Sequence, residues 1–357
     1  MSKQNFTKRL LLWNTKYNTR LMPWKGEKDP YKIWISEIIL QQTQVGQGLD
    51  YYNRFITAFP NINKLAKAPE QKIFKLWEGL GYYTRCKNLI ETAKYIANNK
   101  YGKFPDTYSD ILDLKGIGPY TAAAIASFAF NLPYAVVDGN VFRVLSRFFG
   151  IDTAINSSSG KILFAARAQE LLDKKFPGIY NQAIMDFGAV ICKPKNPLCL
   201  SCPIKSDCKA RLQDKINLLP VKTGKLKKRI RFFYYFIIEY KAKIYIRKRA
   251  EKDIWENLYE FVLMETEKLL PVNSIAHTAF YKAFSNKNKA DIRQVSNIYR
   301  QQLTHQTIQG RFILVKLKNT LPLKGYKAVT YKELAKLPFP KLITAYLAEN
   351  ELKPFER

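Results

Sequence analysis

The chain has 357 residues and a formal net charge of +30, from 59 lysines and arginines against 29 aspartates and glutamates. This length predicts two or three packed units, and no fold requires such a charge imbalance, whereas a polyanionic partner exploits it through counterion release. Neither a secretory leader nor an apolar run of about 18 residues is expected, so nucleic acid is favoured over an anionic membrane surface as the partner.

The first 220 residues show helical periodicity. Apolar residues recur at three- and four-residue spacing in six segments, separated by Pro, Gly and Asn: 33–45, 71–80, 85–98, 119–130, 139–149 and 161–173. This pattern predicts a mostly α N-terminal part.

One turn between these helices is rich in glycine. The stretch "LKGIGPYTA" (114–122) has Gly116 and Gly118 before Pro119, a residue typical of the first helical turn. Glycines let the backbone approach a ligand, and amide N–H groups at a helix N-terminus attract an anion such as a DNA phosphate. A plain interhelical turn would have the same pattern, so both interpretations stay open. Further on, Asp138 in "VVDGNVFRVL" could cap the next helix or face a cleft.

Four of the five cysteines lie close together in "CKPKNPLCLSCPIKSDC", as Cys192, Cys199, Cys202 and Cys208. In a chain without an expected secretory leader, such a group favours metal binding over disulfides. Structural zinc sites usually pair two close doublets, and here only Cys199 and Cys202 form a C-x2-C. The irregular spacing favours a four-iron cluster, with zinc as the alternative.

The pattern changes after residue 220. Residues 221–231 are basic and poorly patterned, which is typical of a linker. Beyond them, "RFFYYFIIEY", "KIYIRKR" and "GRFILVKLK" are aromatic and β-branched, which predicts strands. The sequence therefore predicts a helical domain over 1–220, a linker over 221–231, and a smaller α+β domain over 232–357.

Taken together, these motifs resemble a known family. The glycine turn, the aspartate some twenty residues later and the four-cysteine loop look like the helix-hairpin-helix DNA glycosylases that carry a [4Fe–4S] cluster. Within that superfamily, four stretches resemble the A/G-specific adenine DNA glycosylases, the MutY family: "SEIILQQTQV" (36–45), "GLGYYTRCKNL" (79–89), "VVDGNV" (136–141) and "MDFGAVIC" (185–192). "DIWENLYEFV" (253–262) and "LTHQTIQGRFILV" (303–315) are similar to the family's Nudix-like domain. The resemblance implies a two-lobed helical fold with the hairpin near 110–124 and one cluster in the loop 192–208.

The resemblance also implies catalytic roles. Release of adenine needs an acid that protonates the base and a negative group that stabilises an oxocarbenium-like sugar. Glu37 matches the family's general acid and Asp138 its second carboxylate, while Asn140 and Tyr120 match positions that line the pocket. Apolar neighbours would raise the pKa of Glu37, although a solvated helix carboxylate is the alternative.

Tyr120 bears on the type of reaction. Related enzymes of the endonuclease III type have a lysine at this position, which forms a Schiff base with the sugar before strand cleavage. Because a phenol cannot form an imine, Tyr120 predicts a monofunctional glycosylase that uses water and leaves an abasic site.

Further residues match family positions that contact DNA once the target base has left the helix. Gln42 and Tyr82 match wedge residues, with core packing as the alternative for Tyr82. Thr43 and Leu80 match contacts to the opposing base, and Gln182 matches the position that binds the edge of the flipped adenine. Contacts to DNA phosphates are expected from Gly116, Gly118, Lys193 and Lys195.

The C-terminal domain lacks the glutamate cluster of a Nudix box, so we do not expect diphosphate hydrolysis there. In the family, a loop with the sequence "FSH" recognises 8-oxoguanine opposite the adenine. Here Leu303, Thr304 and His305 occupy the loop, so the hydroxyl and imidazole are kept and the aromatic ring is lost. Recognition of 8-oxoguanine by Thr304 and His305 is therefore predicted, with an ordinary surface histidine as the alternative for His305.

The sequence thus predicts a monofunctional adenine DNA glycosylase that removes adenine mispaired with 8-oxoguanine or guanine from double-stranded DNA. Tyr120 and the C-terminal domain disfavour the first alternative, a bifunctional glycosylase and lyase of the endonuclease III type. The pair Glu37 and Asp138 disfavours the second, a non-catalytic iron–sulfur protein that binds DNA. We expect a monomer in the bacterial cytoplasm, associated with the nucleoid through DNA and with no membrane partner.

Overall fold

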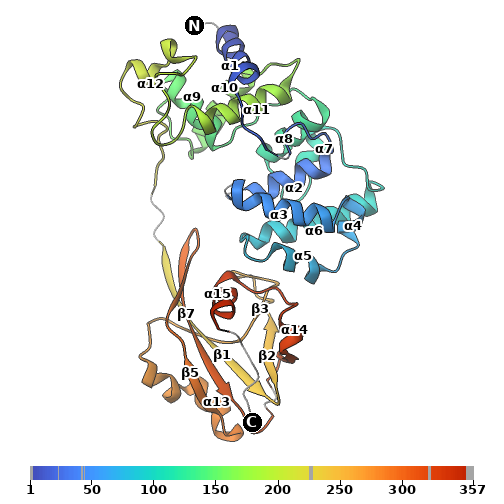
Figure 1. Cartoon of the computed structure of the whole chain (residues 1–357), viewed down its shortest axis with the longest axis vertical. Helices are drawn as coiled ribbons and strands as arrows, with labels where there is room; N and C mark the ends of the chain where they lie inside the picture. Colours follow the sequence, from blue (N-terminus) through green and yellow to red (C-terminus); the bar gives the residue numbers. More distant parts are fainter. Residues whose placement is uncertain are drawn as a thin grey trace. The chain divides into compact units, whose positions relative to one another are not determined.

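The computed structural model describes residues 3–22, 24–41, 43, 45–224, 228–320 and 323–350. Figure 1 shows its helices and strands and labels most of them. By their internal contacts, the residues divide into two compact units. We call them the helical unit, made of 1–67 and 88–224, and the sheet unit, made of 68–87 and 225–357.

The helical unit has the mostly α structure that the periodicity predicts. Its helices are α1 (Lys3–Tyr17), α2 (Pro30–Leu40), α3 (Val45–Ala58), α4 (Ile62–Ala66), α6 (Tyr83–Asn99, from residue 88), α7 (Tyr108–Leu112), α8 (Pro119–Phe130), α9 (Gly139–Phe149), α10 (Ser158–Leu171), α11 (Pro177–Val190), the 3-10 helix η1 (Lys205–Asp207) and α12 (Lys209–Leu212). None of the described helices is both long enough and apolar enough to span a bilayer.

Local signals set the bounds of the helices that carry the site. Pro119 begins α8 and Asp138 caps α9, and these two helices have the predicted bounds. The single helix predicted over 33–45 is wrong. The backbone turns away at Gln41, with φ −55° and ψ 112°, so that α2 ends at Leu40 and α3 begins at Val45.

Two sets of contacts hold the helices around the site. One apolar core joins α1, α9, α10 and α11 through residues such as Phe6, Val144, Phe164 and Phe187. The other brings α2 against α8, where Gln41 Nε2 donates to Thr121 Oγ1 at 3.2 Å. Helix α2 is buried on almost every side, so a polar side chain on it is removed from water.

The sheet unit confirms the predicted strand-rich C-terminal architecture. Its elements are α5 (Glu70–Trp77), β1 (Arg229–Tyr240), β2 (Lys243–Lys248), β3 (Tyr259–Glu260), β4 (Val262–Thr266), the 3-10 helix η2 (Val272–His277), α13 (Ala279–Asn288), β5 (Asp291–Val295), β6 (Tyr299–Gln302), β7 (Gln306–Lys316), β8 (Lys327–Thr330), α14 (Tyr331–Leu334) and α15 (Lys341–Glu349).

The sheet is mixed and runs in the order β3-β2-β1-β7-β5, with β4 on β1, β6 on β7 and β8 on β2. Strands β1 and β7 are parallel over their length, from Arg229 opposite Gln306 to Glu239 opposite Lys316. Alternate residues of these strands point to opposite faces. Phe236 packs with α13 in one apolar cluster, whereas Phe312 stacks on Tyr346 of α15 with ring centroids 4.0 Å apart.

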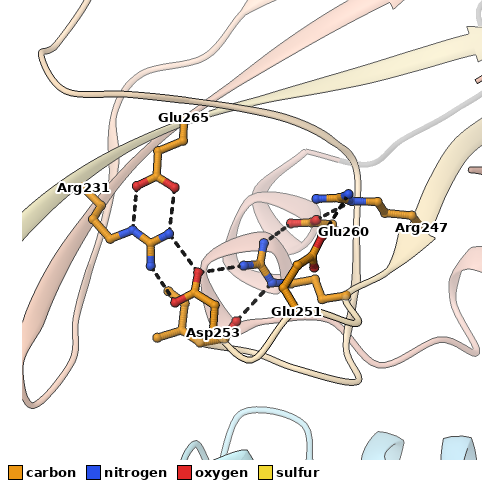
Figure 2. A network of polar contacts seen from close by, with 8 residues as sticks. Arg231, Arg247, Glu251, Asp253, Glu260 and Glu265 are labelled. Atoms are coloured by element: carbon orange, nitrogen blue, oxygen red, sulfur yellow. Dashed lines mark hydrogen bonds and ion pairs between the residues drawn. The ribbon is translucent and has the colours of Figure 1, made fainter. Parts of the chain in front are cut away.

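A chain of ion pairs joins the strands at one side of the sheet unit (Figure 2). Arg231 of β1 forms paired hydrogen bonds with Asp253 and with Glu265 of β4. Arg249 continues the chain by donating to Asp253 at 3.1 Å and to Glu260, whose carboxylate is fully buried. Since these guanidinium groups are paired with carboxylates, they stabilise the sheet unit and their charge is compensated within it.

Residues 68–87 are predicted from the sequence to belong to the helical domain, but by their contacts they group with the sheet unit. Lys75 of α5 donates to the Leu337 carbonyl at 3.0 Å, and the Phe339 N–H donates to Glu78 Oε1 at 2.7 Å. The segment that contains Leu80 and Tyr82 is thus tied by hydrogen bonds to the residues before α15.

Candidate active site

A cavity of about 870 Å³ lies in the helical unit. Its walls come from α2, α8, α9, α11 and the irregular segment between α1 and α2. Six of the residues predicted to act in catalysis or substrate binding line it: Glu37, Thr43, Tyr120, Asp138, Asn140 and Gln182. The structure therefore brings together side chains that lie up to 145 residues apart, from Glu37 to Gln182.

Glu37 is a buried carboxyl group on α2. Asp29 caps this helix by accepting from the Tyr31 N–H, and Pro30 occupies its first position. The Glu37 side chain is only 6% exposed, and burial raises its pKa from 4.5 to about 7. The Tyr120 hydroxyl donates a hydrogen bond to it and lowers this pKa, while the nearby charge of Asp138 raises it. Glu37 is therefore able to hold a proton near neutral pH.

Tyr120 lies in the first turn of α8, directly after the glycine turn. Burial raises the pKa of its phenol well above the ordinary value, and the neighbouring Glu37 and Asp138 add to this effect. The phenol is consequently neutral and can donate its proton to Glu37 in a hydrogen bond.

Asp138 caps α9 and also lines the cavity, so the two roles considered for it from the sequence, a helix cap and a residue that faces a cleft, are both observed. Its carboxylate accepts from the Val141 N–H and from Asn140 Nδ2, each at 2.7 Å. Burial raises the pKa of Asp138, and these two hydrogen bonds oppose that rise. Arg143 in turn donates to Asn140 Oδ1 at 2.8 Å and to the Gly188 carbonyl at 2.7 Å, which fixes the amide beside the carboxylate.

The segment between α1 and α2 supplies cavity residues that sequence reasoning missed. Arg20, Met22, Trp24 and Lys25 all line the cavity. The available signal was a tryptophan flanked by cations in an irregular stretch, "RLMPWKGEKDP", which has no periodicity to place it. These side chains add an aromatic ring and two cations to the pocket.

The glycine turn has the backbone that the sequence led us to expect. Gly116 has a φ of +80°, and a Cβ there would lie 2.6 Å from Asn88 Cβ, so no other residue fits without displacement. Thr92 donates to the Lys115 carbonyl at 2.8 Å and holds the turn against α6. At Gly118, the N-cap of α8, an added Cβ would meet no protein atom within 4 Å. Contact with a phosphate at this turn stays a prediction.

The four clustered cysteines line one small cavity of about 30 Å³. Apolar side chains, including Val144, Phe148 and Phe187, form the rest of its wall, and Arg147 donates to Cys192 Sγ at 3.5 Å. Within the part of the chain that the structure describes, no three Cys, His, Asp or Glu side chains converge as they would around a single ion. A four-iron cluster gives each thiolate its own iron, so its ligands surround a volume instead of meeting at a point. Four thiols that line one small cavity are the donor set that such a cluster requires.

The other predicted contact residues lie elsewhere. Leu80 is 7% exposed, whereas Tyr82 is 43% exposed and has a left-handed φ of +49°. Thr304 and His305 are exposed in the turn between β6 and β7, and Thr304 Oγ1 lies 3.0 Å from the Tyr82 hydroxyl within the sheet unit. Gln42 falls outside the described residues. In the loop between Cys192 and Cys199, Lys193 is half-buried and Lys195 is exposed.

Two protein families match the chain. The HhH-GPD superfamily of base excision DNA repair proteins matches residues 35–169, and the NUDIX domain matches residues 234–349.

Curated relatives with the name adenine DNA glycosylase are similar over most of the chain. The protein of Buchnera aphidicola subsp. Baizongia pistaciae is 38% identical over 308 residues, which is 85% of this chain and 84% of the relative. That of Buchnera aphidicola subsp. Acyrthosiphon pisum is 34% identical over 296 residues, 80% of this chain and 85% of the relative. The human protein is 39% identical over 211 residues, 57% of this chain and 38% of the relative.

Solved structures are similar in fold. A thermostable thymine-DNA glycosylase has a TM-score of 0.54 and 32% identity, over 59% of this chain and 97% of that chain. Endonuclease III in a non-covalent complex with DNA has a TM-score of 0.51 and 19% identity, over 60% of this chain and 98% of that chain, which supports the fold alone.

Proposed function

The chain belongs to the adenine DNA glycosylases of the helix-hairpin-helix superfamily, which are hydrolases of base excision repair, and we propose that it removes adenine mispaired with 8-oxoguanine or guanine from duplex DNA without cleaving the strand. The observation that carries this proposal is the buried Glu37 with a pKa of about 7, hydrogen-bonded to Tyr120 and close to the charge of Asp138 in one cavity.

Glu37 acts as the general acid in this proposal. A carboxyl group with a pKa of about 7 holds its proton at neutral pH in a large fraction of molecules, and it transfers that proton to a ring nitrogen of the flipped adenine. Protonation turns the purine into a neutral leaving group. The Tyr120 hydroxyl then stabilises the Glu37 carboxylate that remains, because a hydrogen bond from a neutral phenol favours the charged form.

Asp138 stabilises the sugar from which the base departs. As the C–N bond breaks, positive charge develops on the deoxyribose, and a carboxylate close to it lowers the energy of that state. The Val141 N–H and the Asn140 amide hold the Asp138 carboxylate in one orientation, so it needs no rearrangement during the reaction. Water then adds to the sugar, its released proton passes to the Glu37 carboxylate, and an abasic site is left.

A lyase would need an amine in the cavity that can form a Schiff base with the sugar. Tyr120 cannot form an imine, but Lys25 and Lys28 also line the cavity. Lys25 donates to Asp186 at 3.2 Å and Lys28 to the Phe128 carbonyl at 2.9 Å, so attack on the sugar by either would require breaking these contacts. Hydrolysis without strand cleavage is therefore the reaction that these contacts support.

We also propose that a [4Fe–4S] cluster is held by the four cysteines that line the smaller cavity: Cys192, Cys199, Cys202 and Cys208. When bound, this cluster supplies a covalent cross-link for the loop that they share. The chain's own residues already tie this loop to α9, since Arg143 donates to the Cys192 carbonyl at 2.7 Å and Arg147 to the Lys193 carbonyl at 2.7 Å.

The contacts to DNA complete the proposal. Phosphates bind at the glycine turn and at the loop lysines, through Gly116, Gly118, Lys193 and Lys195. Tyr82 and Gln42 enter the base stack, Thr43 and Leu80 contact the opposing base, and the Oε1 or Nε2 atom of Gln182 binds the edge of the flipped adenine. Thr304 and His305 recognise 8-oxoguanine. The place of action is then the compartment that holds the chromosome.

A single-turnover assay tests this function. Duplexes with adenine opposite 8-oxoguanine, guanine or thymine are incubated with excess protein, and strand breaks are counted with and without alkali. We expect breaks only after alkali, fast for the first two duplexes and slow for the third. Breaks without alkali would indicate a lyase, and equal rates on all three duplexes would rule out the proposed mismatch preference.

A further inference from the structure

Asp186 of α11 is a fully buried carboxylate that accepts hydrogen bonds from four side chains of the helical unit. Asn18 Nδ2 donates to it at 2.9 Å, Arg20 at 2.8 Å and Lys25 Nζ at 3.2 Å, all from the segment between α1 and α2. The fourth donor is Gln182 Nε2, one turn earlier on α11, at 2.9 Å.

This arrangement determines which way the Gln182 carboxamide faces. A carboxylate paired with two cations accepts hydrogen bonds and does not donate them. Rotation of the Gln182 amide by half a turn would place Oε1 against the Asp186 oxygens, and two acceptors would then face each other without a proton between them. Nε2 is therefore held toward Asp186, and Oε1 is left on the other side of the amide, at a residue that lines the catalytic cavity.

The orientation of this amide bears on which base the pocket accepts. At position 6, adenine carries an amino group, which is a donor, whereas guanine carries an oxygen, which is an acceptor. A carboxamide that is fixed with its oxygen toward the base accepts a hydrogen bond from the amino group of adenine. The same oxygen repels the oxygen of guanine. Resting on the proposed contact between Gln182 and the flipped base, we infer that Asp186 is a positioning residue that sets the preference for a 6-amino purine by holding the Gln182 carboxamide in one orientation.

A purely structural role for Asp186 predicts a different result. Asp186 also compensates Arg20 and Lys25, whose side chains line the cavity, so its loss leaves uncompensated cations near the base. Positive charge opposes protonation of any purine, with or without an amino group. This effect lowers excision of all bases alike, whereas loss of the amide orientation lowers excision only of bases that carry the 6-amino group.

The experiment combines a change in the protein with a change in the base. Single-turnover rates are measured for adenine and for unsubstituted purine, which lacks the 6-amino group, each placed opposite 8-oxoguanine. The readout is the ratio of the adenine rate to the purine rate. In Asp186→Asn the side chain can donate or accept, so Gln182 takes either orientation, and we expect this ratio to fall by about tenfold. The intrinsic reactivity of the two bases cancels, because the same substrates are used for both proteins.

Two further variants support the comparison. Asp173→Asn is the matched control: Asp173 Oδ1 accepts from the N–H groups of Lys175 and Phe176 just before α11, and it does not line the cavity. We expect its ratio to equal that of the unmodified protein. Gln182→Leu removes the amide, so it should lower the ratio by itself, and adding Asp186→Asn to it should cause no further fall.

A second pair of variants removes the charge of Arg20 in case Asp186→Asn does not fold. If Asp186→Asn does not fold, because Arg20 is left unpaired, the same ratio is compared between Arg20→Gln and Arg20→Gln with Asp186→Asn. A ratio that falls in Gln182→Leu but stays unchanged when Asp186 is replaced would overturn this inference alone. An unchanged ratio in Gln182→Leu would remove the proposed contact of Gln182 with the base, and failure of the unmodified protein to excise adenine would remove the proposed function itself.

Discussion

The hydroxyl group of Tyr120 donates a hydrogen bond to the carboxyl group of Glu37 inside the cavity of the helical unit. This contact joins the first turn of α8 to the middle of α2. It also opposes the effect of burial, since it favours the charged form of Glu37 and holds its pKa at about 7 instead of a higher value. Tyr120 thereby adjusts the pH range in which the acid of the reaction keeps its proton.

Replacement of Tyr120 by Phe should shift the pH dependence of excision. Loss of the hydrogen bond raises the pKa of Glu37 above about 7, so the acid keeps its proton at higher pH. The rate of the wild-type protein should fall as pH rises through about 7, and in Tyr120→Phe this fall should begin at higher pH. Single-turnover rates over a pH series measure it. Tyr108→Phe, a tyrosine of α7 in the same unit, serves as the control; a shift of the fall to lower pH would contradict the assigned role.

Replacement of Glu37 by Gln should change the stability of the protein in a pH-dependent way. The pKa of Glu37 rises from 4.5 to about 7 on folding, so the folded chain binds this proton more tightly than the unfolded chain. The stabilising contribution of this proton to the free energy of unfolding is fully present below about pH 4.5 and is lost as pH rises through about 7. The loss amounts to ~3 kcal/mol. Glu37→Gln removes this loss, so its melting temperature should exceed that of the wild type at pH 8 by more than at pH 4.5.

Thermal unfolding of both proteins at the two pH values gives this difference directly. The same variant should still bind the duplex but lose excision by on the order of a hundredfold or more, because the proton donor is gone. A difference in melting temperature that is the same at both pH values would show that the Glu37 carboxyl titrates normally.

The parts of the fold that the sequence predicts well are those with strong local signals. Helix α8 begins at Pro119, and α9 begins directly after its N-cap Asp138. The two helices end before Asn131 and Gly150, which have left-handed backbone, and each signal is visible in the sequence. The helix over 33–45 is wrong because apolar periodicity continues through Gln41, where the backbone changes direction. No local pattern indicates that turn.

The residues of the candidate site also fall into those that the sequence indicates and those that it does not. Glu37, Tyr120 and Asp138 lie in motifs that can be recognised one at a time, and their convergence on one cavity follows from the resemblance to a family. Asp186 lies in the stretch "MDFGAVIC", but that motif does not indicate its role: its partners Arg20 and Lys25 are more than 160 residues earlier in an irregular segment, and only the folded chain brings them together. Contacts of this range leave no signal in a single sequence.

The proposed cluster predicts an iron content. The purified protein should be brown and contain about four irons per chain, with an absorbance from charge transfer between sulfur and iron. Cys199→Ala should lower the iron content, because Cys199 lines the small cavity, whereas Cys86→Ala should retain it, because the buried Cys86 is not among the residues that line this cavity. A colourless protein with stoichiometric zinc would contradict the cluster.

The turn between β6 and β7 allows the recognition of the opposing base to be tested apart from catalysis. Thr304 and His305 are exposed there, the Leu303 N–H donates to the Gln306 carbonyl at 2.8 Å, and the His305 carbonyl accepts from the Arg229 N–H at 3.2 Å. Because the backbone of the turn supplies these bonds, replacing the two exposed side chains should leave the sheet unit folded.

In the variant with both Thr304→Ala and His305→Ala, excision of adenine opposite 8-oxoguanine should fall more than excision opposite guanine. Two polar contacts that distinguish the bases are worth on the order of 1–3 kcal/mol, so the preference should narrow by about tenfold. The measurement is the ratio of single-turnover rates and of affinities for the two duplexes at one salt concentration. Lys241→Ala, at the exposed turn between β1 and β2, controls for a general loss of affinity.

Tyr82→Phe separates two ways in which Thr304 could act. Thr304 Oγ1 lies within hydrogen-bond distance of the Tyr82 hydroxyl. Thr304 could therefore act by positioning Tyr82, the proposed wedge residue, instead of contacting 8-oxoguanine itself. Tyr82→Phe keeps the ring that enters the stack and removes only that hydrogen bond. If Thr304 contacts the base, Tyr82→Phe should keep most of the preference for 8-oxoguanine, while the double alanine variant loses it. If the two proteins lose the preference equally, Thr304 acts by holding Tyr82, and equal losses on both duplexes would leave the turn with a role in general affinity alone.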